Sequence, residues 1–273
     1  MSDQIPVRRP RFLPPHPPGA AGTRGGPPTT PPGGTAAPQS PLHPDASPTN
    51  TPSPGAPSPG APPWASEALA AIRRADPPLG AVPDRCGPLP WRRRAPGFPG
   101  LLRAICGQQI SNRAAGAIWA RLRAIPGATT PDGLLRLDDA ALCGVGGLSR
   151  PKAAHARSLA TAVLDGTLRL DALATMPDEE AVAHLTAIRG LGRWTAQVHL
   201  LFAEDRPDLF PDGDLALAAS LALLRGLPAR PSPKLLAEMA TLWMPWRSLA
   251  ARLLWHHWRH ATGRPGADPE DDG

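Results

Sequence analysis

The stretch HLTAIRGLGRWTAQVHLLFA, residues 184–203, says most about how this chain folds. A helical segment that ends near Ile188 meets Gly190-Leu191-Gly192, and a second helical segment follows almost at once. Two glycines in so tight a turn leave the backbone uncovered, so the first amides of the second helix can point outward and attract an anion. The stretch therefore predicts two helices joined by a turn. The turn is either an anion-binding element or an ordinary helical hairpin whose glycines only permit the reversal.

The charge of the chain bears on which anion that would be. Lys and Arg total 29, of which only Lys152 and Lys234 are lysines, against 23 Asp and Glu, for a net charge of +6. Guanidinium groups pair with phosphate through a planar fork, which favours a polyanion partner such as DNA. Arg193 and Thr195 are placed to add a charge and a hydroxyl to the same phosphate. The excess of Arg over Lys is by itself equally typical of a GC-rich coding sequence.

The flanking sequence carries the helix-start signals of an all-α protein. Predicted N-caps recur at Ser66, Ser111 and Thr130, the last directly before a proline. No convincing run alternates β-branched with polar residues, so a sheet is not expected. The sequence predicts an all-α fold of about ten short helices.

Proline and glycine mark the expected boundaries of the folded part. Residues 1–64 hold 20 of the 39 Pro and 8 of the 27 Gly, and we predict that they form a disordered tail. Residues 65–262 are expected to form one folded domain, and residues 263–273 a disordered acidic tail. The start lacks an apolar signal region, and the most apolar run, residues 215–224, is too short to cross a bilayer. We expect a cytoplasmic protein with no membrane contact.

A carboxylate follows the hairpin at a suggestive place. In DLFPDGDLALAASL, Asp214 stands where a Pro/Gly loop gives way to an apolar helix, 22 residues after Gly192. That is a good N-cap position, and capping is the default reading of an isolated Asp there. The helix start also favours negative charge, which suits a group that must remain anionic beside a developing cation. The two roles are compatible.

Taken together, these motifs resemble the helix-hairpin-helix DNA glycosylase superfamily, and within it the bacterial DNA-3-methyladenine glycosylase II enzymes. The resemblance rests on the hairpin GLGRWTA, the Pro/Gly loop with its Asp, and the segments PGFPGLLRAICGQQIS (96–111), GLSRPKAAHARSLA (147–160), FPDGDLAL (210–217) and MPWRSLAARLLW (244–255). It covers about residues 66–260. It implies two packed helical subdomains with the active-site cleft between them. It also implies a monomeric, nucleoid-associated enzyme that hydrolyses the N-glycosidic bond of alkylated purines in duplex DNA for base excision repair.

The resemblance also implies roles for individual residues. Asp214 matches the catalytic carboxylate. The phosphate-gripping hairpin comprises Gly190, Gly192, Arg193 and Thr195.

Three larger side chains match further positions of the family. Trp194 and Trp255 correspond to the aromatic residues that line the base pocket, although core packing is the alternative for both. Gln109, in GQQIS, corresponds to the wedge that fills the gap left by the extruded nucleotide. Its alternative is a polar helix terminus.

Several sequence differences from members of this superfamily limit the reaction that the resemblance implies. Bifunctional glycosylase/lyases of the superfamily have a Lys where this chain has Trp194, so no Schiff-base step is expected. No Cys follows Cys143, so no iron–sulfur cluster is expected, and we predict neither a cofactor nor a metal. Val198 replaces a cleft Tyr of the enterobacterial enzyme. Two alternatives stay open: a non-catalytic helix-hairpin-helix DNA-binding module, and a sister glycosylase for oxidised or mismatched bases.

Overall fold

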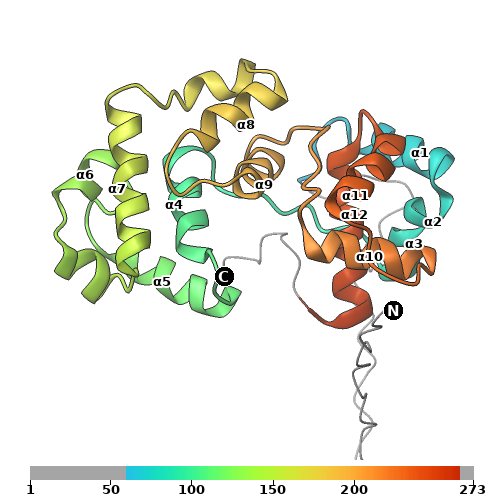
Figure 1. Cartoon of the computed structure of the whole chain (residues 1–273), viewed down its shortest axis with the longest axis horizontal. Helices are drawn as coiled ribbons and strands as arrows, with labels where there is room; N and C mark the ends of the chain where they lie inside the picture. The colour runs from blue at the N-terminus through green and yellow to red at the C-terminus, as the bar shows by residue number, and fades with distance from the viewer. Residues whose placement is uncertain (1–59, 265–273) are drawn as a thin grey trace, which may run out of the picture. The chain divides into compact units, whose positions relative to one another are not determined.

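A computed structural model describes residues 60–264, and the secondary structure of that range is entirely helical (Figure 1). This confirms the predicted all-α fold. Nearly all of the two predicted tails, residues 1–59 and 265–273, lies outside the described residues. Within residues 60–264, no helix is both long and apolar enough to cross a membrane.

The helices form two groups that pack mainly within themselves (Figure 1). The first group comes from both ends of the described chain: α1 (Ala65–Ala75), α2 (Pro77–Gly80), α3 (Val82–Cys86), α10 (Leu215–Arg225), α11 (Pro233–Ala240), the 3₁₀ turn η3 (Thr241–Trp243) and α12 (Arg247–Thr262). The second group is the continuous middle: α4 (Gly97–Gly107), α5 (Asn112–Ala124), α6 (Pro131–Arg136), the π-helical turn η1 (Ala140–Val145), α7 (Arg150–Leu164), the 3₁₀ turn η2 (Asp171–Thr175), α8 (Asp178–Thr186) and α9 (Arg193–Ala203). These are the two packed subdomains that the sequence predicts.

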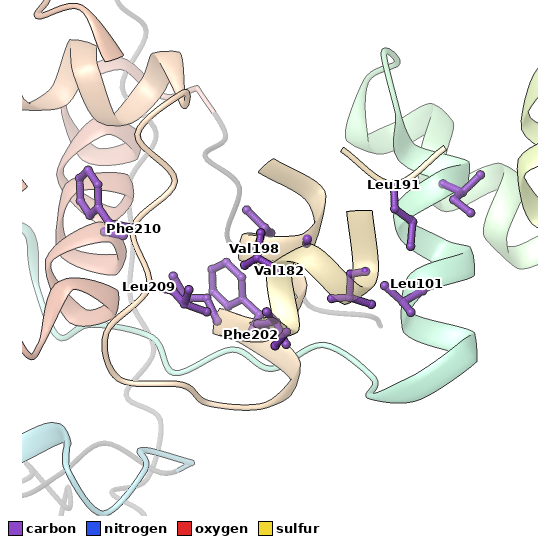
Figure 2. Close-up of a cluster of buried hydrophobic side chains, with 14 of the residues drawn as sticks. Leu101, Val182, Leu191, Val198, Phe202, Leu209 and Phe210 are labelled. Atoms are coloured by element: carbon purple, nitrogen blue, oxygen red, sulfur yellow. The ribbon is translucent and has the colours of Figure 1, made fainter. Parts of the chain in front are cut away.

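Buried side chains join the two groups at the end of α9. Phe202, on α9, stacks on Trp255 of α12 with ring centroids 5.5 Å apart. The buried Arg252 donates to the carbonyl of Leu201 at 3.0 Å and lies over the Phe202 ring. Figure 2 shows Phe202 near Leu209, which belongs to the loop that returns to the first group. The chain crosses between the groups beside this apolar junction, so α9 and the start of α10 are held by the same core.

The helix starts follow local chemistry where polar side chains are available. Ser111 accepts from the amide of Ala114 at 3.3 Å, and Thr130 accepts from that of Gly133 at 3.3 Å, which confirms both predicted caps. The prediction for Ser66 is wrong, because α1 begins one residue earlier and Trp64 occupies the N-cap position without a capping bond. Instead, the Trp64 indole stacks on Trp246 and donates to the carbonyl of Asp205 at 3.1 Å. Tertiary packing thus decides where α1 begins.

Candidate active site

The turn between α8 and α9 has the geometry of a helix-hairpin-helix. Gly190 adopts φ 97°, a left-handed conformation that favours glycine, and the amide of Leu191 donates to the carbonyl of Ile188 at 3.0 Å. Gly192 is the N-cap of α9, with no side-chain capping bond and no acidic residue in the first turn. A Cβ built on Gly192 would meet nothing within 4 Å. The first amides of α9 are therefore uncovered, as the sequence predicts.

The hairpin side chains differ from expectation. Both guanidinium ends of Arg193 bind the carboxylate of Glu179 on α8, each at 3.0 Å, so Arg193 is engaged rather than free for a phosphate. This pairing lowers the pKa of Glu179 below its ordinary value and raises that of Arg193. Thr195 is only 6% exposed. The contact of its hydroxyl with a phosphate stays a prediction, and the backbone at Gly192 is the part of the hairpin that no side chain covers.

Asp214 is held in place by three donors. It is the N-cap of α10, and its Oδ1 accepts from the amides of Ala216 and Leu217 at 2.8 and 2.9 Å. Its Oδ2 accepts from the indole Nε1 of Trp194 at 2.9 Å. Hydrogen bonds to an ionised acceptor are the stronger kind, and here they come from the helix start and from one neutral ring. The carboxylate is a fixed anion at the start of α10.

The second role of Trp194 was not apparent from sequence. Asp214 is 8% exposed, whereas Trp194 is 41% exposed, so the indole reaches the carboxylate with its nitrogen and still presents surface to solvent. The predicted stacking face and the observed hydrogen bond use different parts of the ring. Leu215, the next residue after Asp214, is 70% exposed and adds a further apolar surface beside the carboxylate. An exposed leucine at a helix start has no sequence signal of its own.

The other predicted aromatic lies elsewhere. Trp255 has 0% exposure and packs against Phe202, so its ring has no surface for a base. The base-pocket assignment of Trp255 does not fit this structure, since α12 turns this residue into the junction between the helix groups. Core packing, the alternative weighed from sequence, describes it.

The loop after α4 lies against the hairpin. Gln109 is exposed, as a wedge requires, and its backbone has φ 59°. Its neighbour Gln108 donates through Nε2 to the carbonyl of Gly190 at 2.7 Å. Sequence reasoning singled out the second glutamine of GQQIS and missed the first.

A polar cavity of about 230 Å³ adjoins these elements, and both helix groups contribute to it. Arg193 and Gln197 line it from α9, and Ala240 and Arg247 from the other group. Asp212, two residues before Asp214, also lines it, although Asp214 itself and Trp194 do not. A larger hollow of about 590 Å³ lies at the C-terminal ends of α10 and α11 and along η3, and it includes none of the residues assigned above. The smaller cavity is the cleft that borders the hairpin.

This fold and site define a class of protein. Residues 102–246 match the HhH-GPD superfamily of base excision DNA repair proteins, and the chain belongs to that family. This confirms the resemblance drawn from the motifs.

Individual relatives agree with that membership. The chain is 31% identical over 159 residues to DNA-3-methyladenine glycosylase 1 of Schizosaccharomyces pombe, which covers 57% of this chain and 69% of the relative. It is 30% identical over 218 residues to DNA-3-methyladenine glycosylase 2 of Escherichia coli, which covers 71% of this chain and 73% of the relative. Among solved structures, the S. pombe 3-methyladenine DNA glycosylase in complex with abasic DNA is similar with a TM-score of 0.63 and 26% identity, covering 71% of this chain and 95% of that one.

Proposed function

We propose that this protein is a DNA glycosylase that releases alkylated purines of the 3-methyladenine type from duplex DNA and leaves an abasic site for base excision repair. The observation that carries the proposal is Asp214, an anion held by two amides and one indole, next to the uncovered amides of α9. The names of the relatives support the same chemistry.

One carboxylate suffices for such a substrate. An alkylated purine carries positive charge on its ring, so the base departs without prior protonation. As the bond breaks, the sugar acquires oxocarbenium character. The fixed anion of Asp214 stabilises that cation and orients or deprotonates the attacking water.

The base has to leave the stack to reach Asp214. Extrusion costs a few kcal/mol and is least costly for damaged pairs. The exposed face of Trp194 holds the cationic base by cation–π attraction, on the order of 0.5 to 2 kcal/mol. Such a face selects electron-poor bases broadly.

The same residue argues against a lyase step. A Schiff base needs an amine beside the sugar, and the hairpin position where bifunctional relatives have Lys is Trp194 here. We propose a monofunctional, cofactor-free hydrolase that acts as a monomer on DNA in the cytoplasm.

The direct test is release of free base. The purified full chain is incubated with three duplexes, containing 3-methyladenine, 8-oxoguanine or uracil, and the supernatant is separated by chromatography. Release of 3-methyladenine above the other two is expected. Preferential release of 8-oxoguanine or uracil would favour a sister glycosylase. Binding to every duplex with no base released would favour a non-catalytic module and contradict the proposal.

A further inference from the structure

The loop between α4 and α5 presents an unusual tip. Gln109 is exposed and Ile110 is 38% exposed, so two sizeable side chains stand together in solvent. Gln109 has φ 59°, a left-handed conformation that non-glycine residues rarely adopt. A backbone in this state persists only if its neighbours hold it. We call residues 109–110 the tip.

The residues on either side of the tip supply that support. The amide of Gln108 donates to the carbonyl of Ile105 at 3.3 Å, which closes α4. Ser111 caps α5 through the amide of Ala114. Lys152 of α7 donates through Nζ to the carbonyl of Cys106 at 2.7 Å. The first two bonds fix the tip to the helices beside it, and the third joins the end of α4 to α7.

One further bond links this loop to the hairpin between α8 and α9. The side-chain Nε2 of Gln108 reaches the carbonyl of Gly190 at 2.7 Å, across a separation of 82 residues. It is the bond by which the residue next to the tip holds the hairpin. Gly190 is confined from another side as well, since a Cβ built on it would lie 2.4 Å from Cγ of His155 on α7. The turn of the hairpin is therefore clamped between Gln108 and His155.

We infer that Gln108 is a positioning residue that couples the tip to the hairpin, so that binding a DNA strand at the hairpin places the tip at the base stack. This inference rests on the proposed function, because it assigns the tip to base extrusion. A hairpin that binds the phosphates of a DNA strand and a tip that enters the DNA base stack must keep a set separation to act on one nucleotide. The bond from Gln108 to Gly190 provides that fixed relation.

The test compares two duplexes, one undamaged and one with a tetrahydrofuran abasic-site analogue. The measured quantity is the ratio of the two dissociation constants, because the gap in the second duplex is what the tip would fill. In Gln108→Met, which keeps the length of the side chain and loses the donor, the preference for the abasic analogue is expected to fall about five-fold, the size of one hydrogen bond. Affinity for the undamaged duplex is expected to stay within about two-fold of the wild type, because the uncovered amides of α9 remain.

A double-variant cycle separates coupling from a general loss of structure. In the background Gln109→Ala/Ile110→Ala, adding Gln108→Met is expected to change the preference by less than about 1.5-fold, because the tip is already absent. Lys152→Met is the matched control. It removes the side-chain bond from α7 to Cys106 at the end of α4, and that bond does not involve the hairpin. It should weaken both duplexes alike.

Two results would overturn the inference. One is an equal loss of preference with and without the tip residues, and the other is an equal weakening of both duplexes by Gln108→Met. This binding test does not depend on base release. A protein that releases no base yet shows the coupling would contradict the proposed function alone.

Discussion

The indole Nε1 of Trp194 donates to Oδ2 of Asp214 at 2.9 Å, and this bond ties the first turn of α9 to the N-cap of α10. One residue belongs to the middle helix group and the other to the group formed by the chain ends. The carboxylate thus receives donors from both groups, so its position depends on their packing. The same bond limits how the Trp194 ring can turn and so constrains the face that a base would contact.

Removing the charge of Asp214 should separate catalysis from folding. Asn is as good an N-cap as Asp, and Asp214→Asn is expected to keep the thermal midpoint within a few degrees. The Asn amide nitrogen cannot accept from the Trp194 indole, so that bond is lost together with the charge. The single-turnover rate of base release should fall by at least about 100-fold, a magnitude typical of losing one electrostatic contribution at a reacting centre. Affinity for duplex DNA is the internal control and should change little. A variant that still releases base at the wild-type rate would remove Asp214 from the mechanism.

Trp194→Phe keeps an aromatic face and deletes only the indole donor. A hydrogen bond to a charged group contributes about 1.5 to 3 kcal/mol, so a fall in the single-turnover rate of about 10- to 100-fold is expected. Trp246→Phe is the matched control, since Trp246 stacks on Trp64 at the other helix group and has no part in the site. Its rate should stay within about two-fold. Equal effects of the two substitutions would mean that aromatic packing, not the bond to Asp214, matters.

Glu179→Gln should release Arg193 toward DNA. The pair is exposed, and exposed pairs contribute about 0.2 to 1 kcal/mol, so affinity for undamaged duplex should rise by about two- to five-fold. The logarithmic salt slope should steepen by about one as Arg193 gains a phosphate. Glu180→Gln makes the same charge change one residue away, and it should leave the slope unchanged. Identical slopes in the two variants would show that Arg193 does not reach the backbone.

The two hairpin glycines should respond differently to alanine. Gly190→Ala combines a left-handed backbone with a Cβ 2.4 Å from His155, so it should lower the free energy of unfolding by about 2 kcal/mol or more. Gly192→Ala meets open space at an ordinary φ of −82°, and it should change that free energy by less than about 0.5 kcal/mol. Urea titrations of both variants give the comparison. A large loss in Gly192→Ala would contradict the open geometry of the turn.

Stability should fall in mild acid because of His199. Burial, and secondly the charge of Arg94, lowers the pKa of this histidine from 6.5 to about 4, and neither ring nitrogen has a hydrogen-bond partner among the described residues. The unfolded chain therefore binds the extra proton between these two pH values. The contribution of His199 to the free energy of unfolding is therefore fully present above pH 6.5. It declines by about 3 kcal/mol in total as the pH falls toward 4.

His199→Leu provides the check. Unfolding free energies of the wild type and the variant are measured from pH 7 to pH 4. The wild type should lose stability relative to the variant over that window. His257, whose pKa is also lowered by burial, titrates in both proteins and cancels in the difference. Curves that run parallel would exclude His199 as the source.

Several features of this protein are local and could be predicted from the sequence. Helices follow from the absence of strand patterns and from caps such as Ser111 and Thr130, whose bonding partners lie within three residues. The glycine turn and the N-cap place of Asp214 are equally local, because backbone freedom and capping depend on neighbours in the chain.

The rest depends on contacts between residues far apart in sequence. The burial of Trp255, the engagement of Arg193 by Glu179 and the bond from Gln108 to Gly190 have no local signature. The bond from Trp194 to Asp214 likewise exists only because packing brings α9 to the start of α10. The sequence by itself determined which groups are present and which helix ends carry them. Only the tertiary structure decided which side chains are buried, paired or open to a substrate, because burial and pairing are properties of the packed whole.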